Sequence, residues 1–307
     1  MPTPNATKHS PKPKKMTHAM TVDVEDYFHV AAFNQVIDPA TWDTWPCRVE
    51  QNTNTLLALF DRNKIKITFF ILGWVAERYP ELIKRVHQQG HEIASHGYSH
   101  QLIYKQDPKV FREETAKSKQ ILEDLIQQPI NGYRAASYSI TRNSLWALDT
   151  LAELGFTWDS SIFPTRHDNY GIPDSPEEPY KIGTHAGKIL TEFPLTTAKV
   201  FGLSVPAAGG GYFRQYPYFL SRWLFERASL NQTKPQIFYL HPWEIDPDQP
   251  RVPNASRFSN FRHYTNLHRC LPRLENMLRD FKFGTISESL GRTSIEKTIH
   301  IDDLGKS

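Results

Sequence analysis

The sequence predicts an α/β fold made of parallel βαβ units, and three features of the chain lead to this prediction. Short apolar runs typical of strands alternate with amphipathic helical segments from residue 18 to about residue 243. Seven strands can be placed in this span, a number that favours a barrel over an open sheet. Ionisable residues follow the strands, at the carboxyl edge where parallel α/β folds place their functional sites.

Residue pattern and punctuation predict the individual elements. Strand-like runs occupy residues 18–25, 66–72, 91–95, 132–135, 157–162, 188–195 and 236–243. Helical segments occupy residues 53–63, 80–90, 107–126, 142–156, 216–229 and 268–280. Asp107 is expected to cap the helix that begins at Pro108. We expect a long loop over 161–187 and a tight turn at GGGYFR (209–214) that directs Tyr212 and Arg214 to the functional edge.

Composition is that of a globular protein and argues against several functional classes. The 307 residues are 39% hydrophobic and 22% charged, and much of the net charge of +3 lies in KHSPKPKK (8–15), so no nucleic-acid surface is expected. No run of eighteen apolar residues occurs and no secretory signal is visible, so we expect no transmembrane helix and a cytoplasmic location. Cys47 and Cys270 form no CxxC motif, although a single bridge between them stays possible.

One domain is expected to carry the function. Residues 1–17 are rich in Pro, Lys and Thr and are predicted to be a disordered tail. Residues 18–290 are predicted to form the barrel, with a C-terminal extension that begins at about residue 244. Residues 291–307 are predicted to be a polar tail.

The ends of the predicted strands concentrate ionisable residues on one edge. These residues are Asp23, Glu25, Asp26, His96, His100, Arg134, Asp159 and His241. Two imidazoles in the H-x-x-x-H spacing and a carboxylate from the first strand would form a three-ligand hydrolytic zinc site with open positions for water. By position, Asp23 fits a general base, His241 fits a general acid, and Arg134 fits a charge partner for Asp23. His91 begins its strand and is expected at the opposite edge.

Five motifs in order strengthen this interpretation: TVDVED (21–26), HGYSH (96–100), RAASYS (134–139), DSS (159–161) and YLHPWE (239–244). Together they resemble the NodB-like polysaccharide deacetylases of the carbohydrate esterase 4 superfamily. The segments GGGYFRQYP (209–217) and HPWEIDPDQPRV through FRHYTNL (241–267) resemble the subgroup from exopolysaccharide loci linked to exosortase (PEP-CTERM) systems. The resemblance implies a distorted (β/α)7 barrel and metal-dependent removal of N-acetyl groups from an N-acetylhexosamine glycan in exopolysaccharide biosynthesis.

The resemblance also implies roles for individual residues. Asp23 would be the base, His241 the acid and Arg134 the partner of the base. Glu25, His96 and His100 would bind a divalent metal, with zinc expected. Substrate contacts would come from Ser137, Tyr138, Asp159, Trp243 and Arg214, with the backbone N–H near Ser137 stabilising the oxyanion and Asp159 lying near the acid.

Two positions depart from the family pattern. Val24 stands where the family has a second adjacent Asp, so Glu25 is the expected ligand and Asp26 the alternative. Ala136 replaces the usual Pro of the arginine motif. Two other functions stay open. The resemblance extends to barrels that hydrolyse a small cyclic amide or ureide, and the departure at Val24 and Glu25 would also fit non-catalytic glycan binding by a degraded metal site.

Overall fold

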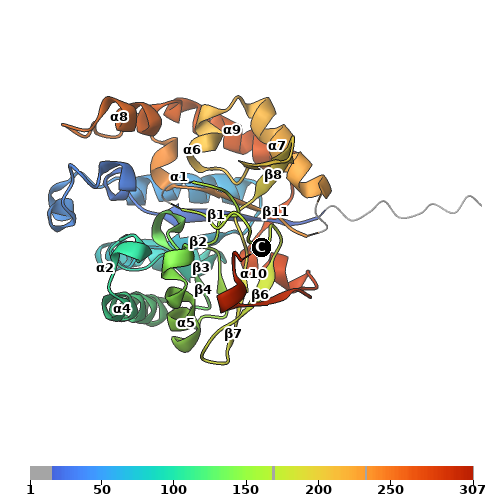
Figure 1. Ribbon diagram of the computed structural model, residues 1–307. Coiled ribbons are helices and arrows are strands. Elements are labelled where there is room, and N and C mark those ends of the chain that lie inside the picture. Colours follow the sequence, from blue (N-terminus) through green and yellow to red (C-terminus); the bar gives the residue numbers. More distant parts are fainter. Residues whose placement is uncertain (1–15, 168–169, 232–233, 307) are drawn as a thin grey trace, which may run out of the picture.

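A mostly parallel sheet forms the centre of the protein in a computed structural model, which describes residues 16–167, 170–231 and 234–306 (Figure 1). Ten strands of this part pair in the order β10-β1-β2-β3-β4-β5-β7-β6-β12, with β11 beside β1. Seven form a parallel series: β10 (Ile237–Leu240), β1 (His18–Val24), β2 (Thr68–Ile71), β3 (Glu92–Ser95), β4 (Gly132–Tyr133), β5 (Trp158–Asp159) and β7 (Ile189–Glu192). They are the seven predicted strands, so the α/β class is confirmed.

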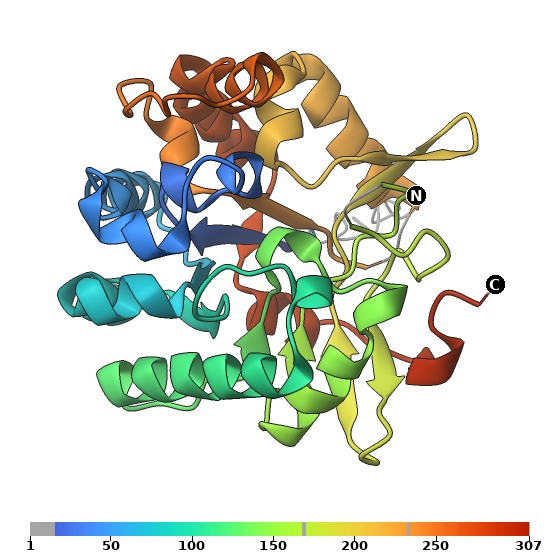
Figure 2. The same ribbon diagram turned by 60° about the vertical axis from the view of Figure 1, so that its left-hand side comes forward.

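Helices cover the outside of the first five strands (Figures 1 and 2). The connections run through α1 (Val49–Arg62), α2 (Gly73–Arg78), α3 (Pro80–Gln88), α4 (Pro108–Ile126) and α5 (Trp146–Glu153). The Asp107 side chain accepts a hydrogen bond from the backbone N–H of Lys109, so it caps α4 as predicted. Apolar strand residues and the inner helix faces share one large buried core.

The free edge of β10 is covered by Thr196 and Gly209 rather than by another paired strand. Within the described residues, no strand pairing joins β7 to β10, so the backbone ladder does not close the barrel. The Thr196 hydroxyl donates to the carbonyl of Ile237 (2.7 Å) and accepts from its N–H (2.8 Å). Gly209 bridges Tyr239 with a φ of 115°, and a Cβ there would lie 2.1 Å from the Tyr239 carbonyl oxygen. Only glycine permits this close approach at the seam.

A C-terminal layer lies along one edge of the molecule (Figure 1). It contains α6 (Gly210–Gln215), α7 (Tyr218–Asn231), α8 (Arg257–Tyr264) and α9 (Leu267–Asp280), and the hairpin of β8 (Thr197–Val200) and β9 (Leu203–Pro206) packs against α7. The prediction of a tight turn at 209–214 is wrong, because five of these six residues lie in α6. The predicted loop over 161–187 is also shorter, since it contains β6 (Tyr180–Gly183).

The C-terminal residues return to the sheet. After β11 (Phe283–Gly284) and α10 (Ile286–Gly291), β12 (Thr298–His300) pairs with β6. Ile301 and Leu304 are buried, so part of the segment predicted as a polar tail packs against the domain. Residues 1–15 of the predicted disordered tail lie outside the described residues, and β1 begins at His18.

Two further predictions concern cysteine and membrane spans. Cys47 and Cys270 are both free, so the bridge that the sequence left open is not formed. In the described part of the chain, no helix is both long and apolar enough to cross a membrane.

Candidate active site

The carboxyl ends of the parallel strands bring the predicted ionisable residues to one edge. Backbone pairing of Val24 with Ile71, and of Ile71 with Ser95, sets the ends of β1, β2 and β3 level. Asp23 lies in β1 and Glu25 follows it, His96 and His100 follow β3, Arg134 follows β4, and His241 follows β10. His91 lies at the opposite edge, where its Nδ1 accepts a hydrogen bond from the Ile67 N–H (3.2 Å).

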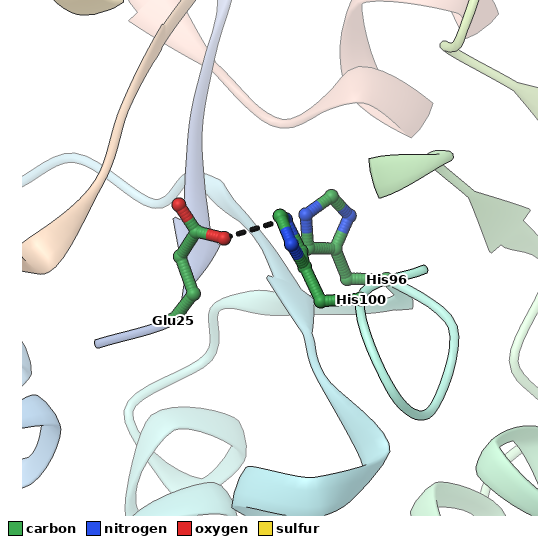
Figure 3. A group of neighbouring side chains, drawn as sticks. All are labelled: Glu25, His96 and His100. Atoms are coloured by element: carbon green, nitrogen blue, oxygen red, sulfur yellow. Dashed lines mark ion pairs between the residues drawn. The ribbon is translucent and has the colours of Figure 1, made fainter. Parts of the chain in front are cut away.

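Glu25, His96 and His100 form a compact buried cluster (Figure 3). One ligand atom from each residue lies within 4.8 Å of the others. The carboxylate and the His100 ring face each other, with 2.6 Å between Glu25 Oε2 and His100 Nε2. The loop that returns His100 to the cluster uses left-handed backbone at Gly97 (φ 73°) and at His100 itself (φ 52°).

The protonation pattern of this cluster suits a divalent cation. His96 Nδ1 lies 2.9 Å from the Arg134 carbonyl oxygen, which can only accept, so His96 Nε2 is left free for a metal. Burial lowers the pKa of His96 to about 4, which keeps its ring neutral. His100 Nδ1 is buried and has no hydrogen bond among the described residues, and the near polar neighbour of Glu25 Oε2 is His100 Nε2. Burial opposes ionisation of Glu25, but the imidazoles of His100 and His241 outweigh it and hold the Glu25 pKa below its usual range.

Asp26, the alternative ligand, points away from the histidines. Its carboxylate accepts hydrogen bonds from the backbone N–H groups of Tyr27 (2.8 Å) and Val49 (2.7 Å) and from the Cys47 thiol (3.0 Å). The side chain thereby caps the short helix η1 (Tyr27–His29) and ties it to the start of α1. Glu25 rather than Asp26 therefore faces His96 and His100.

Asp23 is held by a fully buried arginine. Arg134 Nη1 donates to Asp23 Oδ1 at 2.6 Å and to the Thr21 hydroxyl at 2.8 Å. Its Nε and Nη2 donate to the carbonyl and hydroxyl oxygens of Ser160. The Tyr138 hydroxyl donates to Asp23 Oδ2 at 3.4 Å. These contacts fix the carboxylate in one orientation and offset the cost of burying both charges.

His241 lies between three carboxylates and keeps some exposure to solvent. Its Nε2 is 3.4 Å from Glu25 Oε1 and 4.0 Å from Asp23 Oδ2, and its Nδ1 is 2.6 Å from Glu244 Oε1. Burial alone would lower the pKa of His241, but the carboxylates of Glu25, Glu244 and Asp23 raise it to about 9. At neutral pH the ring is therefore protonated, as a general acid requires.

Arg214 takes a place that the sequence did not predict. Instead of facing the substrate edge, its guanidinium is buried and donates from Nε to Glu244 Oε2 at 2.6 Å. Nη1 donates to the backbone carbonyls of His263 (2.7 Å) and Thr265 (2.9 Å). The α6 helix points this side chain inward, so it supports the carboxylate behind His241 and has no direct access to a substrate.

Trp243 is likewise part of the support behind the site. Its indole stacks between His241, at 5.2 Å between ring centroids, and His263, at 4.3 Å. The indole N–H donates to Glu25 Oε1 at 3.2 Å. His263 Nε2 in turn lies 2.7 Å from Gln249 Oε1. The buried indole therefore orients Glu25 and His241, which differs from the substrate contact predicted for it.

The remaining predicted residues lie on two neighbouring strand ends. Asp159 pairs with Glu192 and accepts a hydrogen bond from the Ser161 hydroxyl at 2.6 Å. The prediction places Asp159 near the acid, but the carboxylate that contacts His241 Nδ1 is that of Glu244. Burial raises the pKa of Asp159 to about 6 and that of Glu192 well above its usual range, so the two carboxyl groups share a proton. Ser137 is half-buried and adopts a left-handed φ of 50°, a strained conformation common at functional sites.

Three residues of the site lie outside the predicted set: Glu244, His263 and Glu192. Glu244 stands in the quoted motif YLHPWE, three residues after His241, and its i,i+3 spacing is the one local signal for it. His263 and Glu192 come from segments whose contacts with the site depend on the tertiary fold. No local pattern indicates either of them.

Known families match both halves of the chain. Residues 39–157 match the family model "Polysaccharide deacetylase", and residues 160–291 match a "Domain of unknown function (DUF3473)", which fits the predicted subgroup. A peptidoglycan-N-acetylglucosamine deacetylase from Bacillus cereus is 29% identical over 120 residues, covering 35% of this chain and 44% of the relative. A chitin deacetylase from Arthroderma benhamiae is 30% identical over 146 residues, covering 45% and 38%. The matched region thus spans less than half the length of these curated relatives.

A solved structure supports the fold assignment. A structure from Mycobacterium smegmatis that is named for the same family aligns with a TM-score of 0.58 at 20% sequence identity, covering 97% of this chain and 98% of that one. At this identity the likeness concerns the fold alone. The family match shows a polysaccharide deacetylase domain over residues 39–157, and the likeness to the solved structure agrees with this fold.

Proposed function

We propose that this protein is a metal-dependent deacetylase that hydrolyses the N-acetyl amide of a glycan containing N-acetylhexosamine. One observation carries the proposal: a cluster suited to a metal, an arginine-held carboxylate and a protonated histidine lie together at one strand edge. Amide hydrolysis needs all three functions, namely polarisation of the carbonyl, a base for the attacking water and an acid for the leaving amine.

Glu25, His96 and His100 would hold the metal. Two imidazoles and one carboxylate are a ligand set typical of catalytic zinc, so zinc is the metal we propose. When bound, the cation would polarise the amide carbonyl and lower the pKa of water in the site. The Arg134 carbonyl fixes the His96 tautomer and the Trp243 indole fixes Glu25, so the ligands are already oriented.

Asp23 would act as the base. As water attacks the acetamide carbon, the Asp23 carboxylate takes the proton that the water loses. The Arg134 guanidinium occupies Oδ1, and Oδ2 lies 4.0 Å from His241 Nε2. Pairing with Arg134 also offsets the cost of burying the Asp23 carboxylate.

His241 would act as the acid. It would transfer a proton to the amide nitrogen as the C–N bond breaks, which releases acetate and the free amine of the sugar. Glu244 on Nδ1 keeps Nε2 directed toward the reacting groups. The backbone N–H near Ser137 would donate to the oxyanion that forms on the carbonyl oxygen.

The substrate class comes from the relatives and the subgroup. The curated relatives are named for peptidoglycan and for chitin, glycans that share N-acetylated aminosugars. The exopolysaccharide-locus resemblance and the match over residues 160–291 support a role in exopolysaccharide biosynthesis. We therefore propose an N-acetylhexosamine-containing exopolysaccharide, or its precursor, as the substrate.

The test measures metal content and acetate release together. Purified protein is assayed for bound divalent ion and for acetate released from chitooligosaccharides, before and after chelation and after readdition of zinc. We expect turnover that chelation abolishes and zinc restores. A protein without bound metal and without acetate release would favour a glycan-binding module, and activity confined to small cyclic amides would favour the ureide-hydrolase alternative.

A further inference from the structure

The C-terminal layer carries exposed apolar side chains on the β8–β9 hairpin, on α7 and on α8. The five most exposed large hydrophobic residues of the described chain are Phe201, Leu203, Phe219, Phe258 and Phe261. All of them lie in the region matched as a domain of unknown function. Grouped exposed apolar side chains mark contact surfaces, because leaving them in water is unfavourable unless a partner covers them.

Helix α8 combines such side chains with arginine. Phe258 and Phe261 are 68% and 66% exposed, and Arg257 and Arg262 beside them are also exposed. The Arg262 guanidinium lies 5.5 Å from the centre of the Phe258 ring. The outward surface of α8 is therefore aromatic and cationic, and its buried residue, His263, faces the domain.

The segment around α8 carries only one sign of charge. Residues 249–274 contain five arginines and no aspartate or glutamate. Arg251, Arg257, Arg262 and Arg269 are exposed, and within the described ranges none of them forms an ion pair with a carboxylate. Cations left unpaired beside exposed phenyl rings match a surface that is both anionic and apolar.

We propose that α8 docks the protein on a membrane surface that bears anionic lipids. Phenyl groups would enter the boundary between headgroups and acyl chains, while the arginines extend to lipid phosphates. The outward position of α8 favours a membrane over a glycan chain, since the helix lies at the outer edge of its layer (Figure 1). Glycan and other ligand sites are concave, whereas these two rings are exposed on the outward surface of a helix.

Docking through α8 would set the orientation of the active site. His263 of this helix stacks on Trp243, and its backbone carbonyl accepts from Arg214, so α8 is tied to the residues behind His241. The catalytic edge would therefore keep a constant orientation relative to the lipid surface. This docking does not depend on the deacetylase proposal and can be measured without a substrate.

The experiment is co-sedimentation of the full chain with vesicles of phosphatidylcholine alone or mixed with phosphatidylglycerol. We expect binding only to the mixed vesicles, and weaker binding as salt rises. Substituting Arg257→Gln with Arg262→Gln should lower the partition coefficient by roughly 30-fold, since each basic residue near an anionic surface contributes about fivefold. Phe258→Ser with Phe261→Ser should cause a similar loss.

Matched variants control for net charge and for apolar exposure. Lys66→Gln with Lys297→Gln removes two exposed cations elsewhere, and Phe201→Ser removes the most exposed phenyl group. Both control variants should leave vesicle binding within a factor of about two, because none of the three substituted side chains lies on α8. Acetate release from soluble chitooligosaccharide should be unchanged in the α8 variants, which separates docking from catalysis.

Three results would overturn the proposal. The first is that the wild-type protein fails to bind mixed vesicles. The second is that the control variants lose as much binding as the α8 variants. In the third, the protein would bind a soluble polyuronate through the same arginines and ignore the vesicles, which would assign the surface to an anionic glycan.

Discussion

Two buried arginine–carboxylate pairs flank the candidate site, and they differ in what the carboxylate reaches. Arg134 holds Asp23 and Arg214 holds Glu244, each at 2.6 Å, and both guanidinium groups are buried. The second oxygen of Asp23 accepts from the Tyr138 hydroxyl and lies 4.0 Å from His241 Nε2. Glu244 instead turns its second oxygen to His241 Nδ1.

The Arg134–Asp23 pair would thus serve the reaction directly, and the Arg214–Glu244 pair would serve it through His241. Arg134 orients a group that would exchange a proton with water, whereas Arg214 orients a carboxylate that acts through an imidazole. Loss of the first pair should remove a catalytic function. Loss of the second should weaken one, because His241 would still be present but less well oriented.

The largest effect on turnover is expected for Asp23→Asn. The amide keeps the shape of the side chain but cannot take a proton, so turnover should fall by about 10²–10⁴-fold. Metal content should stay near that of the wild type, because Asp23 is not one of the three clustered ligand residues. Acetate release and metal analysis on the same preparation check both points, and near-normal activity would contradict the base assignment.

Removal of either arginine should destabilise the protein to a similar extent. Arg134→Met and Arg214→Met each remove the guanidinium that pairs with a buried carboxylate, so the free energy of unfolding should fall by about 3–5 kcal/mol. Urea denaturation measures this change. Arg142→Met, which breaks an exposed pair with Asp174, serves as the control and should cost about 1 kcal/mol or less.

A double variant tests the cause of this loss. Arg214→Met combined with Glu244→Gln removes both charges and should recover most of the stability that Arg214→Met alone loses. If the double variant is no more stable than the single one, packing rather than charge pairing explains the cost.

A smaller loss of turnover is expected for Glu244→Gln. The neutral side chain should lower kcat by about 10- to 100-fold, because the ring of His241 loses its charged partner. KM and metal content should change little. Kinetics at saturating substrate separate kcat from KM. A loss of kcat as large as that of Asp23→Asn would contradict the idea that Glu244 acts only through His241.

The smallest effect is expected for Asp26→Asn. Its carboxylate accepts from the backbone of Tyr27 and Val49, so the free energy of unfolding should fall by about 1 kcal/mol. Metal content and activity should remain, whereas Glu25→Gln should lose the metal. Metal analysis of the two variants side by side makes the comparison, and metal loss in Asp26→Asn would reverse the ligand assignment.

The sequence alone determined the series of strands and the edge that carries the ionisable residues. Strand composition and helix punctuation depend on near neighbours, and parallel strands place their carboxyl ends on one edge regardless of detail. Asp23, His96, His100, Arg134 and His241 can therefore be selected from the order of residues along the chain. The pairing of Asp23 with Arg134 also follows from the need to neutralise buried charge.

Only the tertiary structure decided which way neighbouring side chains face. Glu25 and Asp26 are adjacent acids, and their opposite directions depend on backbone donors at Tyr27 and Val49, the latter brought in from the start of α1. Arg214 turns inward because Gly209 and the two glycines after it begin helix α6 at the seam, where the local pattern predicts a turn. Side-chain direction at the end of a strand is set by partners distant in sequence, and no local pattern contains them.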